Sequence, residues 1–137
     1  MYSKSILVTG GCGFIGSNIV EYLLNNNVKK VRVFDNLSTG YLKNIKPFLD
    51  KYKNLEFMYG DIKNLEDCRK AVKDMDIICH QAALGSVPRS LNDPLSSHNT
   101  NVNGFFNIIL SAKENNIKRV VYASSSSVYG DDEKLPK

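Results

Sequence analysis

One stretch near the N-terminus decides the fold, and it reads Ser5-Ile6-Leu7-Val8-Thr9-Gly10-Gly11-Cys12-Gly13-Phe14-Ile15-Gly16. It begins with a β-prone apolar run, and its glycines satisfy both G-x-G-x-x-G and G-x-x-G-x-x-G. From Phe14 onward, apolar residues recur at helical spacing. The stretch therefore predicts a strand, a tight turn and a helix. In that arrangement, backbone N–H groups and the positive end of the helix can hold a pyrophosphate.

A carboxylate follows at the end of the next predicted strand. Residues 31–34 are β-prone and stop at Asp35, so the first 35 residues contain one βαβ unit. At that position a carboxylate can accept hydrogen bonds from both ribose hydroxyls of a dinucleotide, and it would repel a 2′-phosphate. The nearest cation, Arg32, lies within the strand itself. These features favour NAD over NADP, while a plain strand-to-helix turn without a ligand stays an open alternative.

Strands and helices alternate along the rest of the chain. Further β-prone runs occupy residues 55–59, 76–79 and 119–123, and helical spacing marks residues 65–75, after an Asn64 N-cap, and 102–115. We expect a polar loop after Asp35, a stretch broken by Pro47, and a long functional loop over 82–99 with a helix start near Pro94. Strands joined by helix-length crossovers pair in parallel, so the sequence predicts a three-layer α/β sandwich. Its ligands should lie beyond the carboxyl ends of the strands.

Composition narrows the class of protein. The 137 residues are 42% hydrophobic and 23% charged, which suits one globular domain and argues against disorder or a fibrous repeat. No apolar run approaches the ~18 residues of a membrane span, and no signal peptide is recognisable, so we expect a cytoplasmic protein without a membrane partner. The formal charge of +4 is scattered along the chain. That pattern predicts no nucleic-acid partner.

Cysteines and histidines do not form a metal-binding pattern. Cys12, Cys68 and Cys79 contain no Cys-x-x-Cys pair and fall in apparently regular segments, so we expect reduced, buried thiols. His80 and His98 have no cysteine or carboxylate at ligand spacing. The sequence therefore predicts no metal site.

Two further groups of residues follow strand ends. Asp61 could accept a hydrogen bond from the adenine amino group while Ile62 packs on the ring, although a simple turn aspartate explains the spacing equally well. Ala82 and Ala83, after Gln81, would let ribose and phosphate approach the backbone, and they could equally be core filler.

Taken in order, these residues carry a family resemblance. The motifs are Thr9-Gly10-Gly11-Cys12-Gly13-Phe14-Ile15-Gly16-Ser17, Asp35-Asn36-Leu37-Ser38-Thr39-Gly40, Gly60-Asp61-Ile62, His80-Gln81-Ala82-Ala83, Asn101-Val102-Asn103-Gly104 and Ser124-Ser125-Ser126-Ser127-Val128-Tyr129-Gly130. With them the chain resembles the extended short-chain dehydrogenase/reductase family, which contains NAD-dependent nucleotide-sugar epimerases and dehydratases. Residues 83–90 are most similar to UDP-sugar 4-epimerases that act on UDP-N-acetylglucosamine.

The resemblance implies a role for each matching position. Pyrophosphate would contact Gly10, Gly13, Phe14, Ile15 and Gly16; adenosine would contact Asp35, Asn36, Ser38, Gly40, Asp61 and Ile62; the nicotinamide half of NAD would face Gln81, Ala82, Ala83 and Thr100. The sugar nucleotide would meet Gly85, Ser86, Ser125 and Ser126. His80 would be a packing residue.

Ser125 is the implied catalytic residue. Its hydroxyl could donate to and accept from the sugar O4 and a neighbouring phenol without introducing a charge. Dehydratases of the family carry Asp-Glu after this position because eliminating water needs an acid and a base together, whereas this chain has Ser126-Ser127. The resemblance therefore favours an epimerase that works through a transient 4-keto sugar.

The family's catalytic Tyr-x-x-x-Lys should lie about two dozen residues beyond Ser125, after the last residue, Lys137. We therefore expect residues 1–137 to be an incomplete NAD-binding Rossmann domain, inactive alone, from a homodimeric UDP-GlcNAc/UDP-GalNAc 4-epimerase. Two alternatives stay open. One is a non-catalytic NAD-binding module, and the other is a dehydratase, decarboxylase or reductase of the same family.

Overall fold

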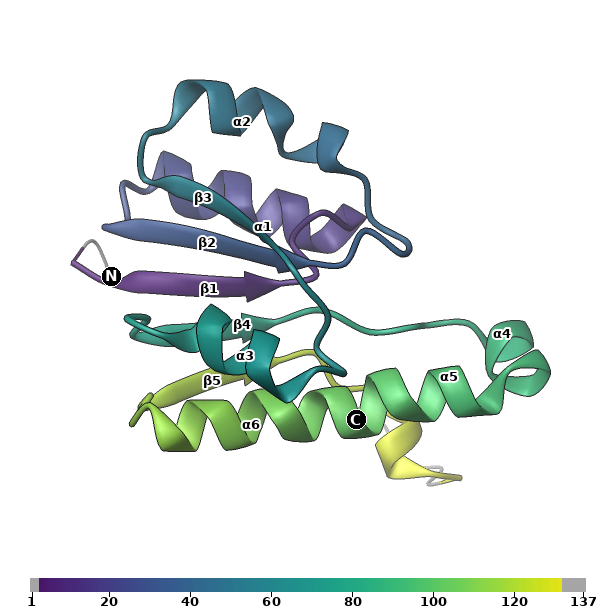
Figure 1. Ribbon diagram of the computed structural model, residues 1–137. Coiled ribbons are helices and arrows are strands. Elements are labelled where there is room, and N and C mark those ends of the chain that lie inside the picture. The colour runs from purple at the N-terminus through teal and green to yellow at the C-terminus, as the bar shows by residue number, and fades with distance from the viewer. Residues whose placement is uncertain (1–2, 132–137) are drawn as a thin grey trace.

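The computed structural model describes residues 3–131, apart from the side chains of Ser126 and Ser127 (Figure 1). Its strands are β1 (Ser5–Thr9), β2 (Lys30–Asp35), β3 (Leu55–Tyr59), β4 (Ile77–His80) and β5 (Arg119–Tyr122). Its α-helices are α1 (Phe14–Asn25), α2 (Lys46–Lys51), α3 (Leu65–Val72), α4 (Val87–Asn92), α5 (Pro94–His98) and α6 (Phe105–Glu114). A π-helical segment, η2 (Asn99–Gly104), joins α5 to α6, and 3₁₀ turns occupy η1 (Leu42–Asn44) and η3 (Ser126–Tyr129).

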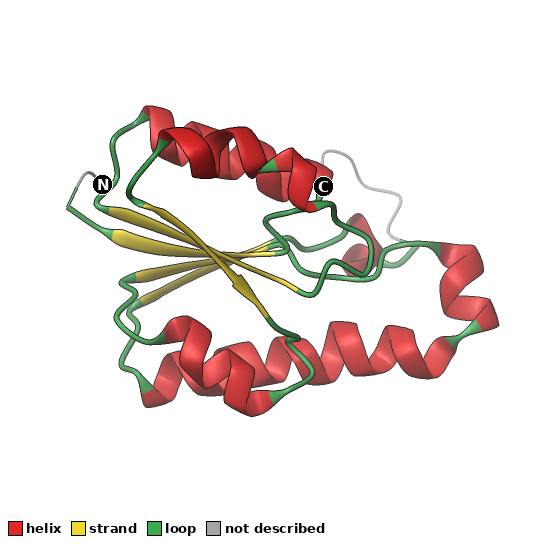
Figure 2. Cartoon of the chain, turned by 45° about the horizontal axis from the view of Figure 1, so that its top comes forward, coloured by secondary structure: helices red, strands yellow, loops and turns green. Residues whose placement is uncertain are grey.

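All described strands pair in parallel, in the order β3-β2-β1-β4-β5. Val8 of β1 lies between Val33 of β2 and Cys79 of β4. Helices cover both faces of the sheet, as Figure 2 shows. The predicted parallel three-layer α/β sandwich is therefore confirmed.

Alternation along the strands divides the core into two apolar layers. On β1, Ile6 and Val8 pack on the face that α1 covers with Val20 and Leu24. The intervening Leu7 packs on the opposite face, in the cluster that contains residues of α3 and α6. Successive side chains of a strand point to opposite faces, and both faces here are covered, so β1 reads as a continuous apolar run.

Two short helices lie where the sequence predicted loops. In α2 the residue at the second helical position is Pro47, and in α4 it is Pro88. Proline is tolerated in the first turn of a helix because its missing N–H has no intrahelical partner there. Pro47 therefore lies in the first turn of a helix instead of breaking one. The Ser86 hydroxyl accepts from the N–H of Arg89 at 3.3 Å and caps α4.

Three local predictions are also corrected. The helix α3 ends at Val72, and Met75 is buried beyond it. Cys12 is buried in the glycine turn and not in a regular element. Cys79 is only half-buried, and along β4 it alternates with the buried Ile78 and His80; the Gln81 side-chain amide approaches its sulfur to 3.6 Å.

Among residues 3–131, no helix is both long and apolar enough to cross a membrane. The same residues contain no cluster of three or more His, Cys, Asp or Glu side chains arranged to hold a metal ion.

Candidate functional site

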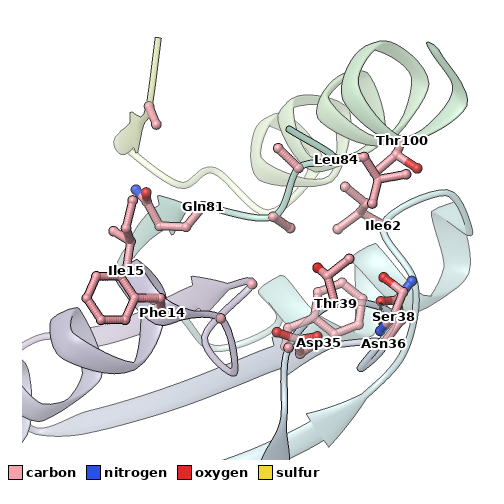
Figure 3. Close-up of a pocket in the computed structure, with 18 of the residues that line it drawn as sticks. Phe14, Ile15, Asp35, Asn36, Ser38, Thr39, Ile62, Gln81, Leu84 and Thr100 are labelled. Carbon is pink, nitrogen blue, oxygen red and sulfur yellow. Dashed lines mark hydrogen bonds between the residues drawn. The ribbon is translucent and has the colours of Figure 1, made fainter. Parts of the chain in front are cut away.

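A cleft of about 440 Å³ opens at the carboxyl ends of β1, β2 and β4 (Figure 3). From β1, the strands β2 and β3 follow toward one edge of the sheet. The next strand, β4, lies on the other side of β1. This is the switch point of the sheet, where the loops after neighbouring strands run in opposite directions and leave a crevice. The residues predicted to bind a cofactor that line it are Gly10, Gly13, Phe14, Ile15, Gly16, Asp35, Asn36, Ser38, Gly40, Ile62, Gln81, Ala82, Ala83 and Thr100.

Two glycines of the turn are required by the protein's own backbone. Gly10 has φ +67°, and a Cβ there would lie 2.7 Å from the amide nitrogen of Ala82. A Cβ at Gly16 would lie 2.1 Å from the carbonyl oxygen of Gly10. Both glycines are therefore explained by the tight packing of the turn, whether or not a ligand binds.

Gly13 has a different explanation. Its φ of −75° suits any residue, and a Cβ there would meet only the Gly10 carbonyl oxygen, at 3.3 Å. It forms the N-cap of α1, a position with no side-chain cap hydrogen bond and no acid in the first turn. The absent side chain thus leaves room at the positive end of a 12-residue helix, where an anion is stabilised.

The Asp35 carboxylate lies between the glycine turn and the next loop. Its Oδ2 accepts from the N–H of Cys12 at 2.9 Å, and its Oδ1 accepts from the N–H of Leu37 at 2.8 Å. The residue is 9% exposed and lines the cleft. Each carboxylate oxygen can accept more than one hydrogen bond, so Asp35 can hold both loops and still accept from a ligand hydroxyl.

The loop after Asp35 packs closely on the glycine turn. The carbonyl oxygen of Cys12 accepts from the N–H of Tyr41 at 3.0 Å and from the Asn44 side-chain amide at 2.8 Å. A Cβ at Gly40 would lie 2.8 Å from the Cys12 carbonyl carbon. Burial, and then the charge of Asp35, raise the pKa of the Cys12 thiol to about 12. Cys12 is therefore a protonated packing residue beneath the turn.

Arg32 points away from the cleft. Its guanidinium donates to the carbonyl oxygens of Ala71 and Lys73, at 2.7 and 2.8 Å, and forms an ion pair with Glu56. It therefore neutralises the carbonyl end of α3. None of the cleft-lining residues, which all fall within the described part of the chain, is a lysine or arginine.

A buried hydroxyl fixes the segment after β4. Thr9 Oγ1 accepts from the N–H groups of Gln81 and Ala82, both at 3.2 Å, and lies 2.8 Å from Nδ1 of His80. With its acceptor capacity used by two amides, the hydroxyl donates to Nδ1. Burial lowers the pKa of His80 to about 4, so the ring is neutral and can accept. His80 also packs edge-on against Phe105, in agreement with the predicted packing role.

Asp61 lies beside the cleft and not in its lining. Its Oδ1 accepts from the N–H of Lys63 at 2.9 Å, and its Oδ2 accepts from the Asn36 side-chain amide at 3.0 Å. Partial burial raises the pKa of this carboxyl, but the hydrogen bonds from Lys63 and Asn36 and the Lys63 charge outweigh it and lower the pKa. Asp61 therefore orients Asn36, a lining residue, and the predicted contact of Asp61 with adenine stays a prediction.

Three of the predicted substrate residues, Gly85, Ser86 and Ser125, lie outside the cleft lining. A Cβ at Gly85 would meet no atom of the described residues within 4 Å, and Ser86 caps α4. Ser125 follows β5 and is exposed, while the Ser126 side chain lies outside the described part of the structure. Ala123, two residues before Ser125, does line the cleft. Their contacts with a sugar nucleotide stay predictions.

Sequence reasoning missed five lining residues, which are Phe34, Thr39, Gly60, Leu84 and Ala123. Each lies at or soon after the carboxyl end of a strand, so the rule that ligands bind at that edge of a parallel sheet could have found them. Leu84 differs from the other four because the side chain of Asn101, in η2, forms hydrogen bonds with its backbone.

Comparison with known proteins agrees with this geometry. Residues 6–137 match the model of the NAD dependent epimerase/dehydratase family. The chain belongs to this family. The resemblance predicted from the motifs is thereby confirmed, and the parallel sheet with its cleft is the part of the family fold that this chain contains.

Similar proteins include several epimerases. A putative UDP-glucose 4-epimerase of Methanocaldococcus jannaschii is 40% identical over 133 residues, covering 96% of this chain and 41% of that protein. The structure of a UDP-N-acetylglucosamine 4-epimerase from Methanobrevibacter ruminantium, in complex with UDP-N-acetylmuramic acid, is 39% identical with a TM-score of 0.88. It matches 100% of this chain and 43% of that one.

A UDP-glucose 4-epimerase of Thermus thermophilus, in complex with NAD, is 35% identical with a TM-score of 0.79 and matches 88% of this chain and 37% of that one. The 137-residue chain thus spans only about 40% of the length of the first curated relatives that it matches.

Gly13 and Gly16 provide a matched pair of substitutions. Gly16→Ala should lower the free energy of unfolding by about 3 kcal/mol or more, because the new methyl meets a backbone carbonyl. Gly13→Ala places the same methyl 3.3 Å from the Gly10 carbonyl oxygen, a contact that a small shift relieves, and should cost no more than about 1 kcal/mol. Urea unfolding followed by circular dichroism measures both, and equal losses would contradict the different origins assigned to the two glycines.

The buried His80 should make stability depend on pH. Its folded-state pKa of about 4 lies below its ordinary value of 6.5, so in that window the unfolded chain binds a proton that the folded chain does not. The free energy of unfolding should therefore fall as pH decreases from 6.5 toward 4, by up to about 1.4 kcal/mol per pH unit.

Urea midpoints between pH 4.5 and 7.5 test this dependence. His80→Asn keeps an acceptor near Thr9 and should remove that part of the pH slope, while His98→Asn, which changes an exposed histidine, should keep it. Identical slopes for both variants would refute the assignment.

Proposed function

We propose that the chain binds NAD in the cleft and is the nucleotide-binding part of a UDP-sugar 4-epimerase, with UDP-GlcNAc and UDP-GalNAc as its sugar nucleotides. The observation that carries the proposal is the room left at Gly13, at the N-terminus of α1, within the cleft that Asp35 also lines. A diphosphate suits the helix end, and the hydroxyls of the adjoining ribose suit the carboxylate.

The chemistry of the cleft supports NAD over NADP. A 2′-phosphate would come close to the Asp35 carboxylate without a cation among the lining residues to neutralise it. Arg32, the candidate nearest in sequence, is engaged at the end of α3. The family's dependence on NAD and the NAD-bound Thermus relative agree with this preference.

Each group of residues would have a separate task. The glycine turn and α1 would hold the diphosphate, Asp35 and the loop through Asn36 and Ser38 would hold the adenosine ribose, and Ile62 would pack on adenine. Gln81, Ala82, Ala83 and Thr100 would face the nicotinamide half. When bound, NAD supplies the carbon that takes a hydride from the sugar and returns it.

Ser125 is proposed to act on the sugar. Its hydroxyl would donate to and accept from the sugar O4 and a neighbouring phenol, while a base outside residues 1–137 would remove the O4 proton as the C4 hydride passes to bound NAD, giving a transient 4-keto sugar. The names of the Methanocaldococcus and Methanobrevibacter relatives support a UDP-sugar 4-epimerase. The sequence Ser126-Ser127 argues against the dehydratase pattern. The homodimer and the cytoplasmic location expected from the sequence stay predictions.

Isothermal titration of the chain with NAD and NADP tests the binding proposal. We expect NAD to bind and NADP to bind at least about tenfold more weakly, because of the charge on Asp35. Gly13→Val should weaken NAD binding by more than about tenfold while leaving the circular dichroism spectrum unchanged. Gly85→Val, at an open position outside the lining, is the matched control. Unchanged NAD affinity in folded Gly13→Val would exclude this cleft as the diphosphate site.

Epimerase activity is tested with a longer, chimaeric chain. Residues 1–137 joined to the corresponding remainder of the Methanobrevibacter relative should interconvert UDP-GlcNAc and UDP-GalNAc, followed by proton NMR. Ser125→Ala should lower kcat about 100-fold, and Ser124→Ala should have little effect. NAD binding without turnover of any nucleotide sugar would favour a non-catalytic module. Formation of a dehydrated or decarboxylated sugar would favour another reaction of the family.

A further inference from the structure

One continuous helical segment runs beside the cleft, from α5 through η2 to α6 (Figure 1). Its middle, Asn99–Gly104, is π-helical. A π-helical turn is wider than an α-helical turn and carries an extra residue, and such turns are frequent at functional sites. Here the wide turn contains Thr100, which lines the cleft, and the neighbouring Asn101.

Asn101 binds both backbone groups of a single residue in the loop after β4. Its Oδ1 accepts from the N–H of Leu84 at 2.8 Å, and its Nδ2 donates to the carbonyl oxygen of Leu84 at 2.9 Å. The carboxamide therefore pairs with Leu84 as the backbone of a neighbouring strand would. Both hydrogen bonds form only when the N–H and the carbonyl of Leu84 lie at fixed positions. The pairing therefore holds the loop backbone in one conformation at Leu84.

The loop is held at two points. Thr9 Oγ1 accepts from the N–H groups of Gln81 and Ala82, which fixes the beginning of the loop to β1. Asn101 fixes it again at Leu84, 17 residues away in sequence. Gln81, Ala82, Ala83 and Leu84 all line the cleft, so the two attachments define one wall.

The same helical segment holds a second part of the cleft by separate contacts. The Asn107 amide donates to the carbonyl oxygens of Ile62 and Lys63, at 2.9 and 3.1 Å. A Cβ at Gly104 would lie 2.6 Å from Cδ1 of Ile62, so the helix and the Ile62 side chain are in close contact. Asn101 and Asn107 thus act on different walls, and their effects on a bound ligand can be separated.

We propose that Asn101 is a positioning residue that holds the Gln81–Leu84 wall against the nicotinamide ring of the dinucleotide. This inference rests on the proposed binding of NAD. Asn101 lies outside the lining, so it acts through Leu84 and through the adjacent Thr100. Asn107 is the corresponding contact for the wall at Ile62, where adenine is proposed to lie.

Binding of NAD and of ADP-ribose, which lacks only the nicotinamide ring, distinguishes this role from general structural support. By isothermal titration, the wild-type chain should bind NAD more tightly than ADP-ribose. Asn101→Ala should weaken NAD binding roughly tenfold and change ADP-ribose binding less than about twofold, because the lost hydrogen bonds order only one wall. Asn107→Ala should weaken both ligands equally.

Two further variants complete the design. Asn103→Ala lies in the same π-helical segment, where the Asn103 amide donates to Oδ1 of Asn99 at 2.9 Å, and it should leave both affinities unchanged. Asn101→Asp keeps the acceptor for the Leu84 N–H and loses the donor to its carbonyl. It should lose part of the preference for NAD, and it tests the proposal even if Asn101→Ala fails to fold.

The outcomes separate the two proposals. Equal weakening of NAD and ADP-ribose by Asn101→Ala, or no change in either, would overturn the positioning role, as would a wild-type chain that binds the two ligands equally. A folded wild-type chain that binds neither ligand would instead refute the proposed NAD site and the positioning role with it.

Discussion

The cleft depends on one buried carboxylate. Asp35 accepts the amide of Cys12 with one oxygen and the amide of Leu37 with the other, and so joins the glycine turn after β1 to the loop after β2. Leu37 adopts φ +59°, a conformation that is costly for a branched side chain. The hydrogen bond to Asp35 and the packing of Leu37 on the core compensate for that cost. Because the charge sits at the end of β2, the loops that it organises are also those that a ribose would contact.

Neutral polar side chains connect further loops on the other side of the switch point. Thr9 connects β1 to the segment after β4, and it needs a neutral His80 to accept its proton. Asn101 and Asn107 then connect the helical segment to two different loops. Thr9 and Asn101 each donate and accept in these contacts, and Asn107 donates to two carbonyl oxygens. These neutral groups fix the position of a loop backbone without placing another charge beside the proposed diphosphate site.

The local structure around Pro47 and Pro88 and the partners of Asp61 could not be predicted from neighbouring residues alone. Pro47 and Pro88 suggest loops when each is read alone, yet both occupy the first turn of a helix, and the cap that starts α4 belongs to Ser86. Asp61 has the spacing of an adenine ligand, and its carboxylate is engaged by Asn36 and Lys63. The pattern of residue types placed Asp61 in the right loop, but it wrongly predicted loops at Pro47 and Pro88. It could not identify Asn36 as a partner of Asp61, because Asn36 lies in another loop.

The sequence alone determined the parallel α/β architecture, the glycine turn, the acidic strand end and the family, because these features follow from periodicity and from short motifs and their order along the chain. Only the tertiary structure decided which glycine is kept for the backbone and which leaves room for a ligand, where Arg32 points, and that Asn101 holds Leu84. Those outcomes depend on contacts between segments that are distant in sequence. The free energy of such contacts is set by packing and hydrogen-bond geometry, which no local pattern records.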